Sequence, residues 1–289
     1  MTENMQDKFL NFVRKRENIR ILREEKGVPE PWTDDPILQK YRFCNIRRED
    51  DKVTRWIRKN LPMQHYESPL DFLIKMAVAR RLNLIRSLQD IKYELNLDRG
   101  WNAKMFNVCN VLMDRKSKGF KIINSAYMVV PPGDSRPLPI WLREVYIPEM
   151  RIFLIRNMKY DYWIRLSNIH DILIQCRGVS DFMSGQILAD CKNDISHPLY
   201  TAKDGEFFVV PGPGSIRGLN RFLYRDVNDR WLASKRNRHM FCIHIEMIAK
   251  KLRDLVDIKL DYQDVQNCLC EFDKYCRAEE NPRGLRRFS

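Results

Sequence analysis

The 289-residue chain lacks several features that mark well-defined protein classes. No two of its eight cysteines have the C-x-x-C spacing, so a zinc site is not expected, and a disulfide scaffold is implausible at this length. No apolar run approaches the roughly 18 residues of a membrane-spanning helix, and none follows the basic residues near the amino terminus. We therefore expect neither a membrane span nor a signal peptide. We expect the protein to be located in the reducing cytoplasm.

Nucleotide-binding motifs are also missing. The Walker pattern G-x-x-x-x-G-K-[ST] does not occur in the sequence, and the glycine-rich stretch GPGSIRG at 212–218 contains no lysine. Its glycines follow G-x-G-x-x-x-G, one residue longer than the dinucleotide-binding fingerprint, and no βαβ alternation surrounds them. We expect no triphosphate or dinucleotide site here, and a plain turn between two helices stays an alternative.

Positive charge is what the sequence has in excess. The sequence has 51 Lys and Arg residues but 38 Asp and Glu residues, which gives a formal net charge of +13 and an isoelectric point of about 9.4. This excess indicates a polyanionic partner such as nucleic acid. Charge alone concerns association rather than fold, so a basic but otherwise ordinary soluble protein stays open.

Apolar periodicity predicts an all-α protein with few or no strands. Ser68, Pro69 and Asp71 form the expected start of the clearest helix, as N-cap, first turn and capping-box position. The stretch 119–137 is ambiguous between a short strand and an extended connection. We divide the chain into a helical extension over 1–31 and a catalytic domain over 32–289. Helices are expected over 5–25, 36–59, 68–90, 101–115, 139–157, 161–177, 181–193, 215–224, 234–257 and 261–279.

Residues 167–191 predict a helix, a tight turn at 177–181 and a second helix. Gly178 and Val179 lie where a helix-hairpin-helix motif places its hairpin, whose backbone N–H groups point at a DNA phosphate. Arg177, Gly178 and Val179 are therefore candidate DNA contacts. An ordinary αα-hairpin would carry a glycine equally well.

The order of these segments resembles the helix-hairpin-helix DNA glycosylases. In those enzymes the hairpin precedes a valine-aspartate pair and a helix with repeated arginines, and FVVPGPGSIRGLNRFL at 208–223 occupies that place here. If Arg217 and Arg221 match the family arginines, the catalytic aspartate position falls near Gly212. The missing carboxylate argues against base excision and leaves base flipping open, whereas a true glycosylase would need a relocated carboxylate such as Asp190 or Asp204.

Three motifs in sequence order carry a closer resemblance. RFCNIRREDDKVT at 42–54, GPGSIRGLNR at 212–221 and CEFDKYCR at 270–277 resemble the phage α-glutamyl/putrescinyl thymine pyrophosphorylases, or amino acid:DNA transferases. The resemblance runs from about residue 32 to 287, although Cys44 stands where a threonine is usual. The same glycosylase-like helical domain occurs in the 5-hydroxymethyluracil DNA kinases of such phages.

This resemblance implies an enzyme that acts on phage DNA in the host cytoplasm. Its substrate would be duplex DNA carrying pyrophosphorylated 5-hydroxymethyluracil, and an amine from an amino acid or a polyamine would replace the pyrophosphate. The missing Walker motif favours this transferase over the ATP-using kinase. No metal or other cofactor is expected, except magnesium bound to the pyrophosphate. A glycosylase and a non-catalytic DNA-binding module stay as alternatives.

The chemistry requires base flipping, cations for the departing pyrophosphate, a base that deprotonates the amine, and exclusion of water. The sequence places Asn45, Arg48 and Asp51 three residues apart, which predicts one shared helix face. Asp51 could be the base, with Asn45 reading a pyrimidine edge, or the three could form a helix cap and a structural ion pair.

Further candidates come from the other motifs. The candidate carboxylates besides Asp51 are Asp190, Glu271 and Asp273. Candidate contacts to substrate, pyrophosphate or DNA are Arg42, Gln186, Gly212, Gly214, Arg217, Arg221, Lys274 and Tyr275. Each arginine could instead form a surface ion pair, and Tyr275 could stack on a base or, as we favour, pack in the core.

Overall fold

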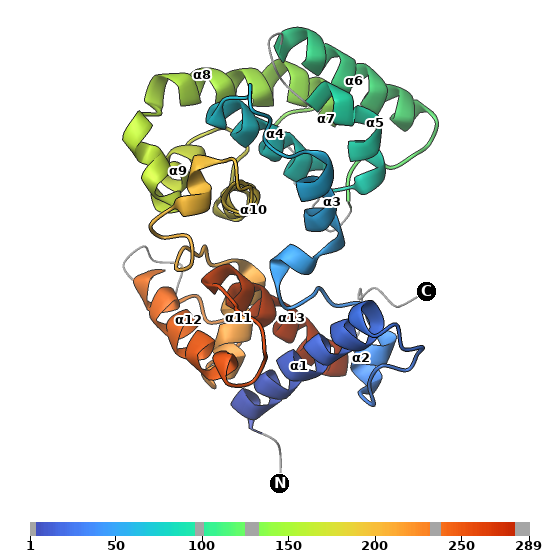
Figure 1. The fold of residues 1–289 in the computed structure, drawn as a ribbon, viewed down its shortest axis with the longest axis vertical. Helices are drawn as coiled ribbons and strands as arrows, with labels where there is room; N and C mark the ends of the chain where they lie inside the picture. Colours follow the sequence, from blue (N-terminus) through green and yellow to red (C-terminus); the bar gives the residue numbers. More distant parts are fainter. Residues whose placement is uncertain (1–3, 96–100, 125–132, 232–237, 281–289) are drawn as a thin grey trace. The chain divides into compact units, whose positions relative to one another are not determined.

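The computed structural model describes residues 4–95, 101–124, 133–231 and 238–280, and these consist of helices joined by loops without a β-strand (Figure 1). The predicted all-α class is confirmed. Contacts divide the chain into two compact units, which we call the split unit (Met1–Asp51 with Glu206–Ser289) and the inserted unit (Lys52–Gly205). This grouping differs from the division at residue 31 that we expected from the sequence.

The split unit is built around α13. Phe9 of α1 packs edge-on against Phe222 of α11 and Phe272 of α13, with ring centroids 5.5 and 5.3 Å apart. Residues expected to belong to a separate extension therefore share one core with the carboxyl-terminal helices (Figure 1). Its elements are α1 (Met5–Arg20), the π-helical turn η1 (Ile21–Glu25), α2 (Pro36–Lys40), the 3-10 turn η2 (Arg48–Asp50), α11 (Pro213–Phe222), α12 (Arg238–Arg253) and α13 (Tyr262–Glu280).

Glycines explain how α11 and α13 come so close. A Cβ added at Gly218 would lie 2.0 Å from the carbonyl oxygen of Leu269, and one at Gly214 would lie 2.5 Å from the Cys270 Sγ. No side chain fits at either position without movement. Two glycines of the GPGSIRG stretch therefore have a packing role against α13.

In the inserted unit the other elements pack around α4, whose residues from Phe72 to Leu82 are all buried. Two charges on this helix are matched inside the unit: Lys75 Nζ lies 2.6 Å from Glu67, and Arg80 makes two contacts of 2.5 Å with Asp190 of α10. The elements are α3 (Lys52–Asn60), α4 (Pro69–Leu82), α5 (Ile85–Leu95), α6 (Trp101–Ser117), α7 (Leu138–Trp141), the π-helical η4 (Leu142–Tyr146), α8 (Ile147–Asn157), the 3-10 turn η5 (Tyr160–Ile164), α9 (Leu166–Leu173), α10 (Asp181–Lys192) and the 3-10 turn η6 (Pro198–Thr201).

Several helix boundaries test the sequence prediction. The start of α4 is confirmed, because Ser68 Oγ accepts a hydrogen bond from the backbone N–H of Asp71 at 3.1 Å. The single helix expected over 68–90 is wrong, since Asn83 adopts a left-handed conformation (φ 45°) that ends α4 before α5 begins. The ambiguous stretch 119–137 lies partly outside the described residues.

The helix expected over 36–59 is also wrong. It ends at Lys40, after which an irregular segment and one 3-10 turn lead to α3 at Lys52. The helix expected over 161–177 is shorter as well, since only α9 (Leu166–Leu173) is α-helical within it.

Candidate functional site

The 44–51 segment of the split unit carries the first predicted motif. Asn45, Arg48 and Asp51 do not share a helix face, because the segment is irregular apart from the turn at Arg48–Asp50. The side chains of Arg47 and Asp50 support that turn through two hydrogen bonds of 3.0 and 2.9 Å. The segment nevertheless folds back on itself, since the Asn45 N–H donates to Asp51 Oδ1 at 3.3 Å.

One face of α13 fixes this segment in place. Asp264 accepts from the Arg48 N–H at 2.7 Å, Asn267 donates to the Asn45 carbonyl at 3.0 Å, and Glu271 accepts from the Cys44 N–H at 2.9 Å. Positions 264, 267 and 271 follow the i, i+3, i+7 spacing of a helix face. The first and third predicted motifs are therefore joined by hydrogen bonds between side chains and backbone.

Glu271 and Lys274 form the charged part of this cluster. Lys274 Nζ lies 3.2 Å from Glu271 Oε2 and also donates to the carbonyl of Arg42, whose own side chain is exposed. The Glu271 carboxylate raises the pKa of the Cys44 thiol, and burial raises the pKa of Cys270 to about 11. Both thiols are therefore protonated at neutral pH, which leaves the carboxylates as the candidate proton acceptors.

The side chains of Asn45 and Arg48 differ in whether their hydrogen-bonding groups have partners. The buried Asn45 amide donates to the Asp50 carbonyl at 2.7 Å, and its oxygen accepts from Arg16, so both ends are used inside the protein. Two nitrogens of the Arg48 guanidinium, Nε and Nη2, are buried without a hydrogen-bond partner among the described residues. Buried donors of this kind are costly unless an acceptor reaches them.

Asp273 is fully buried and forms ion pairs with three arginines. Arg217 Nε lies 2.8 Å from one carboxylate oxygen, Arg277 Nε 3.2 Å from the same oxygen, and Arg221 Nε 3.2 Å from the other. Arg221 also pairs with Glu280 and is nearly buried, whereas Arg217 and Arg277 keep about a third or more of their side chains exposed. The structure thus brings the second and third motifs together at Asp273.

The remaining predicted residues of the split unit pack inside it. The Gly212 N–H donates to Ser215 Oγ at 3.0 Å, so this donor is used at the start of α11. The Tyr275 ring packs 5.1 Å from that of Phe12, and its hydroxyl donates to Asp35 at 2.8 Å, which agrees with the core-packing alternative.

The inserted unit holds the predicted hairpin. Gly178 has φ +81°, and a Cβ there would lie 2.9 Å from the Trp141 ring, so the turn requires glycine for conformation and space. The Arg81 guanidinium donates to the Gly178 carbonyl, Val179 is buried, and Arg177 pairs loosely with Asp134 and Glu149. The predicted helix–turn–helix is confirmed as local structure, and its contact with DNA stays a prediction.

The candidate carboxylates of the inserted unit are engaged in structural contacts. Asp190 is nearly buried in its pair with Arg80, one helical turn from the buried Gln186. Asp204, considered for a glycosylase, accepts from the backbone N–H groups of Leu166 and Ser167 at 2.7 and 3.0 Å, at the start of α9. Both carboxylates therefore already serve the fold.

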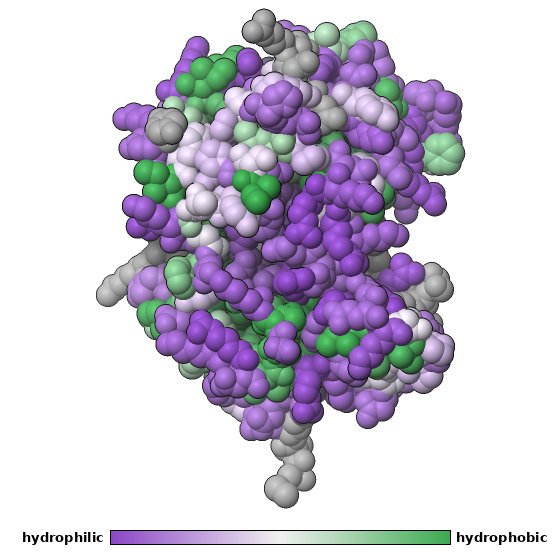
Figure 2. All heavy atoms as spheres, viewed as in Figure 1, coloured by the Kyte–Doolittle hydropathy of each residue, from purple (hydrophilic) through white to green (hydrophobic). Residues whose placement is uncertain are grey.

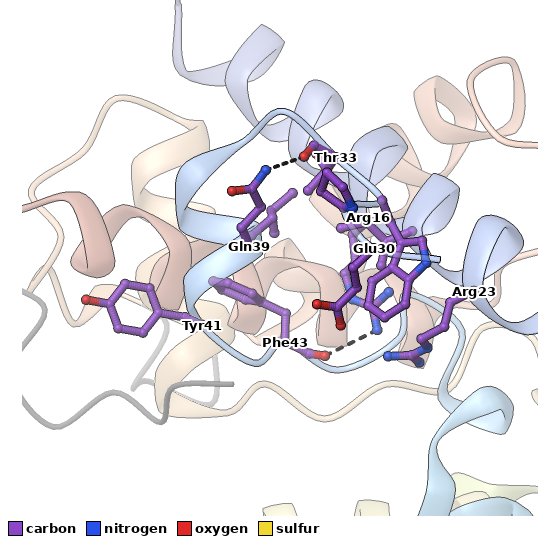
Figure 3. A pocket seen from close by; sticks show the side chains of 11 residues that line it. Arg16, Arg23, Glu30, Thr33, Gln39, Tyr41 and Phe43 are labelled. Atoms are coloured by element: carbon purple, nitrogen blue, oxygen red, sulfur yellow. Dashed lines mark hydrogen bonds between the residues drawn. The ribbon is translucent and has the colours of Figure 1, made fainter. Parts of the chain in front are cut away.

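Sequence reasoning missed a pocket of about 150 Å³ in the split unit, shown in Figure 3. Arg16, buried to 6 % exposure, donates through Nη2 to the Phe43 carbonyl and to Asn45, while its Nη1 is buried without a partner among the described residues. Burial lowers the pKa of Arg16, and the nearby Arg23 adds to this effect. The pocket is lined by Arg16, Ile19, Arg23, Glu30, Pro31, Trp32, Thr33, Leu38, Gln39, Tyr41 and Phe43.

The described residues show neither a metal-binding cluster nor a membrane-spanning helix. No group of three or more His, Cys, Asp or Glu side chains in the described ranges is arranged to hold a metal ion. None of the helices in the described part of the chain has the length and apolar character that crossing a membrane requires.

Comparison with known proteins places the chain in a family. The family model for the helical domain of 5-hmdU DNA kinase matches residues 3–283. A 5-hmdU DNA kinase of Bacillus phage SP10 is 46% identical over 46 residues, which cover 16% of this chain and 7% of the kinase, so the match spans a small part of that relative. No solved structure matches the chain. The resemblance to these kinases is confirmed, whereas the glycosylase-like arrangement and the transferase family stay predictions. The chain belongs to the family defined by the helical domain of the 5-hmdU DNA kinases.

Proposed function

We propose that this chain is a phage DNA-modifying enzyme that replaces the pyrophosphate of 5-pyrophosphorylmethyl-uracil in DNA with an amine. The family match supports DNA containing 5-hydroxymethyluracil as the substrate class, since the relative is a kinase named for that base. The 289 residues contain no Walker motif, so ATP binding would require a site of another kind.

The observation that carries the proposal is the guanidinium of Arg48. Its buried Nε and Nη2 have no hydrogen-bond partner among the residues that the structure describes, and its backbone N–H is bonded to Asp264, beside the Asn45–Asp51 contact. Partnerless guanidinium donors suit phosphate oxygens, and charge on the departing pyrophosphate grows in the transition state. A magnesium ion would arrive with the pyrophosphate as part of the substrate.

The chemical step is a substitution at the methylene carbon on the uracil ring. The amine nitrogen forms a bond to this carbon with its lone pair, the carbon–oxygen bond breaks with its electrons, and pyrophosphate leaves. The new ammonium then loses one proton to a carboxylate, for which Asp51 and Glu271 are our candidates. Asp190 and Asp273 are weaker candidates because arginines already occupy them.

The pocket of Figure 3 offers a place for the amine donor. Arg16 links the pocket to Asn45, and its Nη1 could donate a hydrogen bond to a carboxylate or carbonyl group of the amine substrate. Trp32 and Phe43 form apolar walls. The donor itself stays open between an amino acid and a polyamine.

The test uses DNA with 5-pyrophosphorylmethyl-uracil, the full chain and a mixture of glycine, glutamate and putrescine. Mass spectrometry of the digested nucleosides should detect an amine-adducted thymidine, and Arg48→Gln should slow its formation on the order of 100-fold or more. Asp51→Asn or Glu271→Gln should slow it by a similar factor, whichever residue is the base. Arg156→Gln on the exposed surface of α8 is the control and should keep the wild-type rate.

Unchanged DNA with every amine would refute the transferase. Free base or abasic sites would instead indicate a glycosylase, with Asp190 or Asp204 as the carboxylate to mutate next.

The family description favours one alternative, a helical DNA-recognition module that works beside a kinase domain. Such a module would bind DNA without forming an adduct, and Asp51→Ala would leave both its binding and the partner's activity intact. Adduct formation by the purified chain excludes this alternative.

A further inference from the structure

The inserted unit contains a basic groove whose lining lies mostly outside the sequence motifs. The groove measures about 710 Å³ and is formed by α3, the junction between α4 and α5, and Asn124. Its walls carry the cations Lys52, Arg55, Lys59 and Arg86, four amide side chains and the half-buried Trp56, and no carboxylate. In the view of Figure 2 the surface over α3 is densely hydrophilic.

Three of the four cations in the groove have no ion-pair partner in the described part of the chain. Lys52, Lys59 and Arg86 are exposed and form no ion pair within the described residues. The acidic residue that follows Gln89, Asp90, is paired with Arg115 at 2.6 Å. Like charges gathered without carboxylates repel one another, so this arrangement favours an anionic ligand.

The floor of the groove is fixed by contacts inside the unit. The buried Asn83 accepts from Arg80 at 3.2 Å, and Arg80 is held in turn by Asp190 and Thr54. The Asn124 N–H donates to the carbonyl of Leu82 at 2.9 Å, which attaches this wall to the end of α4. The cations therefore extend from a rigid frame rather than from a loop.

The spacing of the cations fits a polymer better than a single small anion. Lys52, Arg55 and Lys59 follow the i, i+3, i+7 pattern on one face of α3, so the outer two lie about 10 Å apart along the helix axis. Phosphates on one strand of a DNA duplex follow one another every ~3.4 Å of axis, so this face spans several of them. Amide groups and an aromatic ring beside the cations suit sugar, base and phosphate contacts.

We propose that the α3–α5 groove holds the sugar–phosphate backbone of a DNA strand. The choice of DNA as the polyanion rests on the proposed function. The groove supplies contacts that do not depend on base sequence, and its amides and Trp56 position the strand.

The test compares two triple variants of the full chain that remove the same charge. The groove variant is Lys52→Gln/Lys59→Gln/Arg86→Gln. The matched control, Lys121→Gln/Arg156→Gln/Lys203→Gln, changes exposed residues of the same unit that lie outside the groove and have no ion pair in the described residues. Fluorescence anisotropy measures the binding of a labelled, unmodified DNA duplex and of its single strand between 50 and 300 mM salt, that is, over roughly the range in which counterion release dominates. Circular dichroism confirms that both variants keep wild-type helix content and melting.

For duplex DNA, the plot of the logarithm of the binding constant against the logarithm of the salt concentration has a negative slope. If each of the three cations contacts a phosphate, this slope becomes shallower by about 0.9 per contact in the groove variant, or by about 2.7 in total. At 0.1 M salt this slope change corresponds to an affinity loss on the order of several hundred-fold. The control should change the slope by less than about 1. Equal effects of the two triple variants, or no effect of the groove variant, would overturn the proposal.

This experiment separates the groove from the transferase. Unmodified DNA contains no reactive base and no amine is added, so loss of binding in the groove variant supports the groove even if no adduct is ever found. Wild-type protein that forms adducts while the groove variant binds DNA normally would refute the groove alone. Wild-type protein that does not bind DNA would refute it as well.

Discussion

Replacing Gly218 with alanine tests the close contact between α11 and α13. The added methyl group would lie 2.0 Å from the carbonyl oxygen of Leu269, and real Cβ atoms essentially never come closer than 3.0 Å to such an atom. The obstacle is backbone, so it cannot turn away as a side-chain end could. The two helices must therefore separate by about 1 Å or more.

Two effects of opposite sign set the magnitude. Alanine is a better helix former than glycine by about 1 kcal/mol, which stabilises α11. The added methyl group overpacks the contact and pushes the helices apart, which loosens the packing of the fully buried Leu219, Phe222 and Phe272. Overpacking of this kind costs about 1–3 kcal/mol or more. Because the clash is with backbone, we expect a net loss of about 2 kcal/mol in the free energy of unfolding.

Urea unfolding of the full chain measures the effect, with an expected shift of the midpoint by about 1 M. Hydrogen exchange followed by mass spectrometry should locate the lost protection in α11 and α13 rather than in the inserted unit. Gly214→Ala is the matched comparison, since its Cβ meets the Cys270 Sγ, which can move, and Cys270→Ala should recover part of its smaller loss. A Gly218→Ala protein within 0.5 kcal/mol of wild type, that is, inside roughly the usual range for surface substitutions, would refute this reasoning.

Three further predictions concern buried charges and a buried imidazole. Lys75→Met should cost about 3–5 kcal/mol in urea unfolding, because it leaves Glu67 buried and unpaired, and adding Glu67→Leu should recover much of this loss. Asp273→Asn should lower the free energy of unfolding by about 3 kcal/mol, because three arginines lose their common acceptor, and salt should reduce the loss. Burial lowers the pKa of His197 from 6.5 to about 4, so the folded state binds fewer protons than the unfolded state between these values. Stability should therefore fall by about 3 kcal/mol as the pH drops from 6.5 to 4, and His197→Gln should remove that part of the pH dependence.

The sequence predicted features whose causes are local. Ser68 and Asp71 cap a helix because the two side chains and the backbone between them suffice for that contact. The turn at Gly178 was recognisable because a glycine between two helical segments marks a reversal of the chain. The break at Asn83 was missed because asparagine is tolerated inside helices, and only the left-handed backbone conformation reveals it.

The site depended on contacts between distant segments. The shared helix face expected for Asn45 and Asp51 is wrong, and the two residues meet through a loop. This loop is held by α13, since the backbone of Asn45 and Arg48 is bonded to residues more than 200 positions away. The pairing of Asp190 with Arg80, 110 positions apart, has no signal in one sequence. The pocket at Arg16 and the α3–α5 groove likewise arise from tertiary packing, in which distant residues line one space.

The division of the split unit between the two ends of the chain has a consequence during synthesis. Phe9, Phe12 and Val13 of α1 lie in a core formed largely by α11, α12 and α13, the first of which begins at residue 213. A ribosome adds about 5–20 residues per second, so the apolar face of α1 waits on the order of ten seconds or more for its partners. The inserted unit is continuous in sequence and can fold in that interval. Until α11 and α13 have been made, the nascent chain therefore exposes the apolar side of α1, and an exposed apolar surface of this kind is where chaperones bind and aggregation begins.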